Sequence, residues 1–348
     1  MSTDVTLATG GPTADSAPAP ATPPPGGRKA GARIAAVVVG LAAAITLMLC
    51  AFGFPSVNGG PHHAPLGVVG PRSAVTAVQE RLPDDQWDVT TYDDTKALTT
   101  ALHDRDVVGG IALGANGVDV YTAPGGGQQI STAVSGLGTG LADQQHVKAT
   151  THEVVGFGQD DPHGTGLASM ALPMVFGGIL PVLILSAVAP GAGALRTRLA
   201  GVVGFALVAA AGATAVLQFG IGTLDGNYLT SALGLALGML ALGLPLLGLQ
   251  ARFGTPGFLG LSVVMMFLGN PLSGLATGPY WLPDGWSTLG QLLPVGASGS
   301  LLRANAFFDG TGAGGAVVTL SVWALAGLVL VLTAVRRAPA KAEAAPAA

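Results

Sequence analysis

The chain has 348 residues, of which 49% are hydrophobic and only 10% are charged, and its mean hydropathy is +0.57. Soluble domains carry about 25% charged residues, so this composition indicates an integral membrane protein. The net charge of -4 is small and leaves no basic stripe, which excludes nucleic acid as a partner. The single cysteine, Cys50, excludes an intrachain disulfide and a cysteine-based metal site.

The amino-terminal part begins with residues 1–33, which are rich in Pro, Ala, Thr and Gly and are expected to be disordered. The apolar run Ile34–Phe54 is long enough to cross a bilayer, which takes about 20 residues. A signal peptide fits less well, because its apolar core spans roughly 7–15 residues. Since Arg28, Lys29 and Arg33 precede this run, the positive-inside rule predicts a cytoplasmic amino terminus.

Charge and polarity return in residues 55–166. Alternating apolar residues predict strands, and apolar residues at helical spacing predict helices. The expected strands are 66–70, 87–92, 107–113, 117–123 and 147–155, and the expected helices are 73–82, 95–106 and 127–145. The third and fourth strands read as a hairpin. Strands alternating with helices predict a small α/β domain, and the orientation of the first helix places it outside the cytoplasmic membrane.

All six histidines lie in or beside this domain, so a zinc or copper site is one interpretation. Only His62 and His63 are adjacent, and no H-x-x-x-H spacing occurs, so scattered exposed histidines fit better. The stretch 124–127 resembles a phosphate loop but lacks the Lys and Ser/Thr of a Walker A motif. No Ser, His and Asp set stands in a nucleophile context. We therefore expect no catalytic residue, cofactor or metal.

The apolar tract 167–335 predicts five more spanning helices, six in all. Their expected bounds are Leu167–Val188, Leu199–Ile221, Leu229–Leu249, Gly257–Ala276 and Ala316–Val335. Gly234 and Gly238 form a small-xxx-small pair, for which packing within the chain is a simpler explanation than a dimer face. The fold class is thus an α-helical membrane protein with an α/β domain inserted between its first and second helices.

Basic residues in the short loops support this arrangement. With the amino terminus inside, they fall on the cytoplasmic side: Arg196, Arg198, Arg252, Arg336, Arg337 and Lys341. The tail 336–348 is then cytoplasmic as well. The expected helix cores contain no Asp, Glu, Lys, Arg or His. Ion-coupled transporters usually keep such groups at membrane depth. If this chain moves a solute against a gradient, we therefore expect the energy to come from a partner.

The outer segment 270–315 is not charged like an ordinary loop. Its aromatic residues suit a membrane interface: Tyr280, Trp281 and Trp286. Short helices are expected at Ser287–Leu293 and Ser298–Phe308, either re-entrant or lying on the membrane. Re-entrant backbone is tolerated where protein or a water-filled cavity covers it.

The layout of one helix, a large outer insert and five helices resembles the ABC-2-type transporter permeases. It is most similar to the YhgE/Pip-like branch, named for phage infection protein. The most specific stretch is 281–310, in which two Leu-Pro pairs, a tryptophan and an arginine place Pro283, Trp286, Pro294 and Arg303 at family-like positions. The stretches DVVGGIAL, VDVYTAP and QQISTAVSGL of the insert are also similar to that branch.

The resemblance implies a permease that exports a hydrophobic or amphiphilic substrate as a homodimer, or as a heterodimer with a similar permease. It implies a separate cytoplasmic ATP-binding subunit, which would contact the loop 189–198 with Arg196 and Arg198. The alternative is a membrane-anchored envelope binding or scaffold protein whose outer domain binds a partner. Against it, five further helices exceed what anchoring requires.

Overall fold

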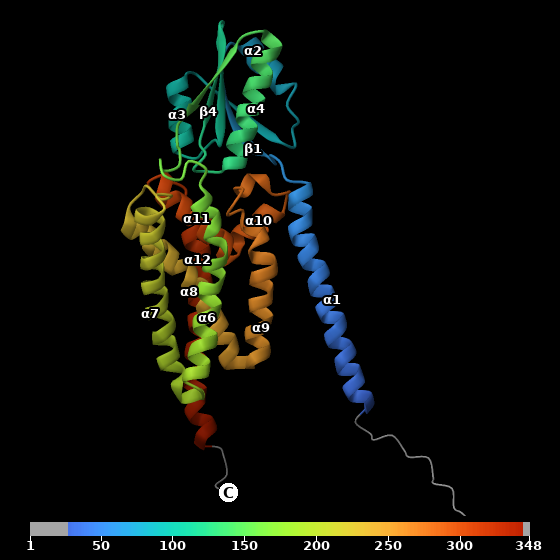
Figure 1. The fold of residues 1–348 in the computed structure, drawn as a ribbon, viewed down its shortest axis with the longest axis vertical. Coiled ribbons are helices and arrows are strands. Elements are labelled where there is room, and N and C mark those ends of the chain that lie inside the picture. Colours follow the sequence, from blue (N-terminus) through green and yellow to red (C-terminus); the bar gives the residue numbers. More distant parts are fainter. Residues whose placement is uncertain (1–26, 344–348) are drawn as a thin grey trace, which may run out of the picture. The chain divides into compact units, whose positions relative to one another are not determined.

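The computed structural model describes the backbone of residues 27–343 and the side chains of residues 31–54 and 57–336. The expectations for residues 1–26 and 344–348 lie outside this range. The chain divides into two units, residues 1–46 and residues 47–348. Helix α1 (Gly27–Val57) begins in the first unit and ends in the second, because the division falls between Thr46 and Leu47. The second unit contains a sheet domain and a helical bundle (Figure 1).

The sheet domain confirms the predicted α/β insert. Within the described residues its strands form one sheet in the order β2-β1-β3-β4-β5. The strands are β1 (Ala64–Val69), β2 (Trp87–Tyr92), β3 (Gly109–Leu113), β4 (Gly117–Thr122) and β5 (Lys148–Glu153). The hairpin pair β3 and β4 is antiparallel, and the other neighbours are parallel. All five predicted strands are therefore confirmed, as is the hairpin.

Three helices pack on this sheet: α2 (Arg72–Gln79), α3 (Thr95–His103) and α4 (Gln128–Gln145). Helix α3 begins where the side chain of Asp94 accepts a hydrogen bond from the amide of Ala97 at 2.7 Å, which is N-terminal capping. Leu98 of α3 is fully buried against the strands, and a Cβ on Gly110 of β3 would lie only 2.5 Å from its side chain. Glycine at this strand position lets the helix approach closely.

The bundle follows the sheet domain. Its α-helices are α5 (Thr165–Ser169), α6 (Ala171–Val188), α7 (Leu195–Ala215), α8 (Tyr228–Phe253), α9 (Thr255–Val264), α10 (Trp286–Leu292), α11 (Pro294–Phe307) and α12 (Gly314–Glu343). Short π-helical turns extend α7 to Gly220 and α9 to Gly269. The 3-10 turns are η1 (Ala192–Ala194), η4 (Pro271–Ser273) and η5 (Pro279–Trp281).

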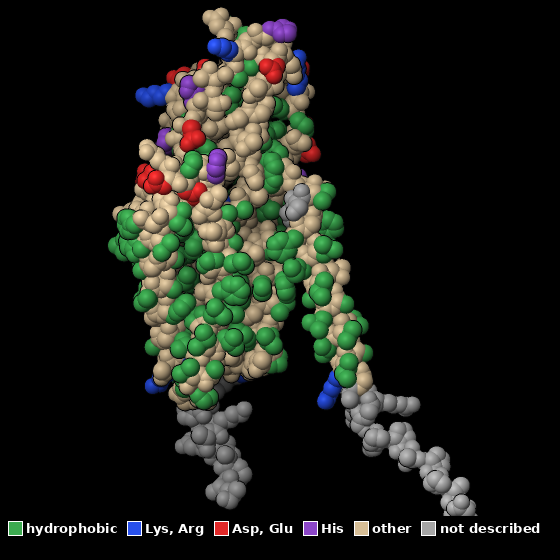
Figure 2. Space-filling view, viewed as in Figure 1, with side chains coloured by type: hydrophobic (Ala, Val, Ile, Leu, Met, Phe, Trp, Pro, Cys, Tyr) green, Lys and Arg blue, Asp and Glu red, His purple; other side chains and the backbone are tan. Residues whose placement is uncertain are grey.

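Among the described residues, five helical segments are long and apolar enough to cross a membrane: Gly31–Phe54, Thr165–Val188, Ala192–Gly220, Tyr228–Phe253 and Gly314–Arg336. The chain is thus a multi-pass membrane protein. Figure 2 shows hydrophobic side chains over the flank of the bundle, whereas charged side chains gather on the sheet domain. Large exposed apolar residues such as Ile184 of α6, Val208 of α7 and Leu325 of α12 supply this lipid-compatible surface.

The remaining predicted span, Gly257–Ala276, is shorter than expected. Helix α9 and its π-helical turn end at Gly269, so the apolar helix covers only Thr255–Gly269. A helix of this length rises about 22 Å, less than the roughly 30 Å of the hydrocarbon core. Pro271 opens a 3-10 turn, and Gly274 adopts a positive φ of 62° that stops further helical winding. The predicted short helices of the outer segment are confirmed as α10 and α11.

Helix α8 is the centre of the bundle. In its apolar span 72% is buried, compared with 33% for α6 and 22% for both α7 and α12. Small residues make this packing close: a Cβ on Gly238 would lie 2.2 Å from Ser298 of α11, and one on Gly327 of α12 would lie 2.3 Å from the backbone nitrogen of Pro245. Gly234 likewise faces Asn305 of α11. The small-xxx-small pair therefore packs within the chain, as predicted.

Asp161 ties the outer ends of the bundle together. Its buried carboxylate accepts hydrogen bonds from the amide and hydroxyl of Thr165 at 2.9 and 2.7 Å, from the amide of Gly166 at 2.9 Å and from the hydroxyl of Thr223 at 2.7 Å. Burial raises the pKa of Asp161, but these hydrogen bonds outweigh it and hold the pKa below its ordinary value. The start of α5 is thereby fixed to the loop between α7 and α8.

Replacing this carboxylate tests the tie. We expect Asp161→Ala to lower the free energy of unfolding at pH 7 by about 2–4 kcal/mol, because several buried donors lose their acceptor. The folded-state pKa is lowered, so the stabilisation is full above the ordinary pKa of about 3.9 and is lost as the pH falls through the folded value. Denaturant unfolding of wild type and variant at pH 7 and pH 3 measures the difference. An equal difference at both pH values, or an equal loss in the exposed control Asp160→Ala, would contradict the assignment.

Candidate functional site

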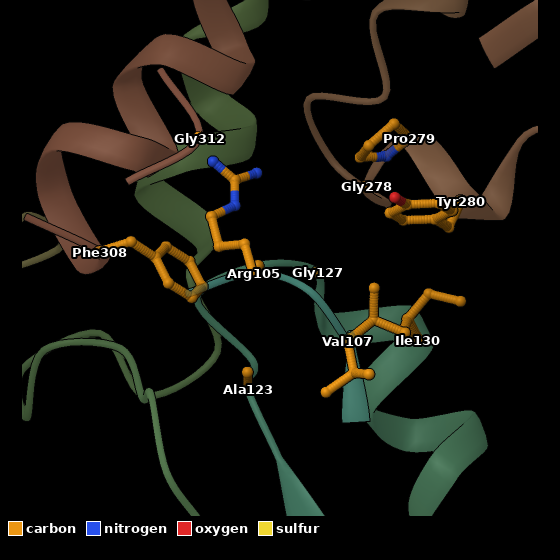
Figure 3. A pocket seen from close by; sticks show the side chains of 12 residues that line it. Arg105, Val107, Ala123, Gly127, Ile130, Gly278, Pro279, Tyr280, Phe308 and Gly312 are labelled. Atoms are coloured by element: carbon orange, nitrogen blue, oxygen red, sulfur yellow. The ribbon is translucent and has the colours of Figure 1, made fainter. Parts of the chain in front are cut away.

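A cavity of about 230 Å³ lies where the sheet domain meets the outer segment of the bundle. The sheet domain contributes residues 105–108 and 123–130, and the outer segment contributes residues 278–280 and 308–312. Figure 3 shows Arg105 and Tyr280 facing each other across this space, with Val107 and Ile130 on its floor. We call it the arginine cavity.

Arg105 follows α3 and is held in an unusual conformation. Its φ of 63° is left-handed, which costs a non-glycine residue about 1–2 kcal/mol. The guanidinium lies 5.0 Å from the ring centroid of Phe308, and its Nη1 donates to the carbonyl oxygen of Thr311 at 3.3 Å. Burial lowers the pKa of Arg105. The surrounding structure therefore fixes a partly desolvated positive charge at the cavity wall.

A second arginine lies behind that wall. Arg303 of α11 is 2% exposed and donates through Nη2 to the carbonyl oxygen of Gly274 at 3.0 Å and to that of Leu275. Its Nη1 is buried without a hydrogen-bond partner. Helix α11 is not one of the spanning segments, and burial together with the positive charge of Arg105 lowers the pKa of Arg303 to about 10. The two guanidinium groups are thus close enough to repel each other electrostatically.

Neither arginine has an acidic partner. Within the described side chains, the ion pairs closer than 4.0 Å all join a histidine to an aspartate, and none includes Arg105 or Arg303. Burying a charge costs several kcal/mol, whereas a cation–π contact returns about 0.5–2 kcal/mol and a hydrogen bond to a charged group about 1.5–3 kcal/mol. The positive charge of the site is therefore only partly compensated.

Helix α4 adds to this charge. It begins at the cavity after Gly127 with no side-chain cap, and the amides of Gln128, Gln129 and Ile130 have no acceptor among the described residues. The first amides of a helix carry a partial positive charge. The backbone passes close to the outer segment at Gly127, where a Cβ would lie 3.1 Å from the carbonyl oxygen of Thr277.

A second cavity of about 390 Å³ borders the loop 270–282 at residues 270–271, 273–277 and 281–282, whereas the arginine cavity borders this loop at residues 278–280. Apart from this loop the second cavity is lined by Ala51 and Phe52 of α1 and by Ala171 of α6. These residues lie near the ends of two segments that are long and apolar enough to span a membrane. We call it the apolar cavity. One loop thus borders both a positively charged space and an apolar one, and Arg303 holds that loop through two of its carbonyl groups.

The four residues at family-like positions lie in different parts of the structure. Pro294 is the first residue of α11, and Arg303 on the same helix fixes the loop. Trp286 begins α10 and makes an edge contact with Phe54 at 6.2 Å, while Pro283 lies in the turn before α10. Tyr280 turned out to belong to the arginine cavity.

Arg196 and Arg198, the two residues predicted to contact an ATPase, differ in exposure. Arg196 is exposed at the start of α7. Arg198 is 8% exposed and donates to Ser186 Oγ at 3.4 Å and to the carbonyl oxygen of Gly191. Arg198 thus shapes the loop, and Arg196 alone of the two projects a free charge.

Sequence reasoning missed Arg105 and both cavities. The local signal was weak, because Asp104 and Asp106 flank Arg105 and suggest an ordinary solvated charge run. Of the histidines, His63 bonds Asp88 and His152 bonds Asp119, both at the surface. Across the described residues no three His, Cys, Asp or Glu side chains gather as a metal site would require.

Comparison of the chain with protein-family models, curated proteins and solved structures gave no match. The site therefore has to be interpreted from its own geometry.

The two arginines should respond differently to an apolar replacement. We expect Arg105→Met to change the free energy of unfolding by less than about 1 kcal/mol, or to raise it, because an apolar side chain removes a poorly compensated charge. We expect Arg303→Met to lower it by about 2–3 kcal/mol, because buried carbonyl groups lose their donor. Chemical denaturation of both variants provides the comparison. A large loss in Arg105→Met would show that this charge is structural.

Proposed function

We propose that this chain is the permease subunit of an ABC-2-type exporter that moves a hydrophobic or amphiphilic molecule. Its resemblance to that family and its multi-pass bundle support this. The bundle also carries irregularities that an anchor does not need: Pro181 and Pro245 inside α6 and α8, and the π-helical turns at the ends of α7 and α9. Such turns are frequent at functional sites.

The observation that carries the proposal is the apolar cavity at the ends of α1 and α6. It lies beside the ends of two segments that are long enough to span a membrane and shares a loop with the arginine cavity of the sheet domain. An amphiphile leaving the bilayer would meet an apolar space first and a charged one next. The sheet domain would then accept the polar end of the substrate outside the membrane.

In this proposal both termini are cytoplasmic and the sheet domain is outside the cell membrane, which requires α9 and the loop 270–282 together to complete a sixth crossing beside the five long spans. The chain direction of the bundle puts Arg196, Arg252 and Arg336 at the end away from the sheet domain (Figure 1). Basic residues at one end favour a cytoplasmic location for it. A separate ATP-binding subunit would dock there against Arg196 and tilt the helices of a permease dimer.

A second function, a membrane-anchored envelope scaffold, is favoured by one observation. Strand β5 is a sheet edge, pairs only with β4 within the described sheet, and exposes all six of its residues. An open edge can accept a strand from a partner. Cross-linking that recovers a cell-envelope protein only while this edge is intact, without any nucleotide-dependent transport, would favour the scaffold.

Charge reversal at the proposed docking loop tests the permease directly. We expect an ATPase to co-purify with the full-length chain, and Arg196→Glu to reduce that recovery and the ATP-dependent flux of reconstituted vesicles at least tenfold. The matched control is Arg72→Glu on the sheet domain, which should leave both unchanged. If no ATPase accompanies the wild-type chain and vesicles containing it show no nucleotide-dependent flux, the permease proposal fails.

A further inference from the structure

The arginine cavity carries more positive charge than the chain neutralises. Arg105 at the wall and Arg303 behind it both lack an acidic partner among the described side chains. The nearest acids along the chain are Asp104, Asp106 and Asp309, and none of them lies within ion-pair distance of either guanidinium. A cavity with this imbalance is suited to a ligand that brings the missing negative charge.

The hydrogen-bond donors of this cavity come from different directions. The guanidinium of Arg105 spends one hydrogen bond on Thr311 and keeps its other N–H groups without a protein acceptor among the described residues. The hydroxyl group of Tyr280 faces it from the opposite wall (Figure 3). The uncapped start of α4 meets the same space beside Gly127 and Ile130. Donors converging from several sides suit an oxyanion, which has several acceptor oxygens.

The loop beside the arginine cavity also borders the apolar cavity. This loop has a small residue at every second position from 274 to 278, namely Gly274, Ala276 and Gly278. Gly274 and Gly278 have φ values of 62° and 92°, conformations that favour glycine, so these two positions carry no side chain. A molecule with a head on one side and a chain on the other could straddle it. The 230 Å³ of the arginine cavity far exceeds the roughly 10–15 Å³ that one water needs.

We infer that the arginine cavity binds the phosphate or carboxylate head of an anionic amphiphile, and that the apolar cavity across the loop 270–282 holds the beginning of its hydrocarbon chain. The inference rests on the proposed function in taking this amphiphile to be the exported molecule. Arg105 and Tyr280 contact the oxyanion in this arrangement, and Arg303 positions the loop and adds long-range positive charge.

Binding is tested on the full-length chain in detergent micelles without added lipid. The probes are dioctanoyl phosphatidic acid, dioctanoyl phosphatidylcholine and inorganic phosphate, each titrated while tryptophan fluorescence is followed. Trp281 lines the apolar cavity and reports its occupation. We expect phosphatidic acid to bind at least tenfold more tightly than either other probe, because it alone supplies an exposed anionic head and a chain.

The variants assign the contacts. Arg105→Gln should weaken phosphatidic acid at least tenfold, since it removes a charge-assisted contact, and Tyr280→Phe should weaken it about threefold, since it removes one neutral donor. Arg72→Gln, on an exposed arginine of the same domain, should change the affinity by less than twofold. Equal affinity of phosphatidic acid and phosphatidylcholine, or unchanged binding in both Arg105→Gln and Tyr280→Phe, overturns the inference. Equal affinity of inorganic phosphate and phosphatidic acid assigns the site to a free oxyanion and overturns its amphiphile part.

The binding and transport results can fail separately. If anion-selective binding is found but no ATP-dependent flux exists, the site stands and the exporter proposal falls. If flux is found and Arg105→Gln transports at the wild-type rate, the exporter stands and this site is not on its path.

Discussion

The junction between the sheet domain and the bundle is marked by two guanidinium groups without an acidic partner among the described side chains, those of the buried Arg303 and the half-buried Arg105. Arg105 rests on the face of Phe308, and Arg303 spends its donors on two carbonyl groups of the loop 270–282. These contacts return less energy than the desolvation of two like charges costs. An apolar side chain in place of Arg105 would remove this cost, so a functional use of its charge explains why the chain keeps it, whereas Arg303 also holds the loop. Uncompensated positive charge is therefore the main feature of the contact between the sheet domain and the bundle.

Arg303 holds the loop 270–282, which lies between the bundle and the sheet domain. This loop exists because α9 ends at Gly269, short of the length that a full span would need, and the chain turns through Pro271 and Gly274. On one side the loop faces the sheet domain, where the amides of Gly60 and His62 donate to the carbonyl oxygens of Trp281 and Tyr280. On the other side it borders the ends of two spanning helices. A broken segment thus connects the ends of the spanning helices with the sheet domain, and irregular backbone of this kind is tolerated where protein covers it.

Much of this fold could be predicted from the sequence, because period and composition encode it. The strands and helices of the sheet domain followed their apolar spacing, and the long spans followed length and hydropathy. The extent of α9 was overestimated because its apolar composition continues past Gly269, while the turn depends on Pro271 and on packing beneath α11. The arginine cavity could not be predicted, since it forms between residues about 200 positions apart, as the Arg105–Thr311 hydrogen bond with a separation of 206 illustrates. Arg303 was singled out from the sequence as a family-like position, but its hydrogen bonds to the loop could not be predicted, because they join residues 28 and 29 positions apart.

A cryo-EM reconstruction of the full-length chain in a nanodisc that contains an anionic phospholipid tests the central claim most directly. The account predicts density for a bound head group in hydrogen-bond contact with Arg105 and Tyr280, with chain density on the far side of the loop 270–282. It would be contradicted by a junction in which Arg105 and Arg303 are ion-paired with Asp104, Asp106 or Asp309 and the cavity holds only water.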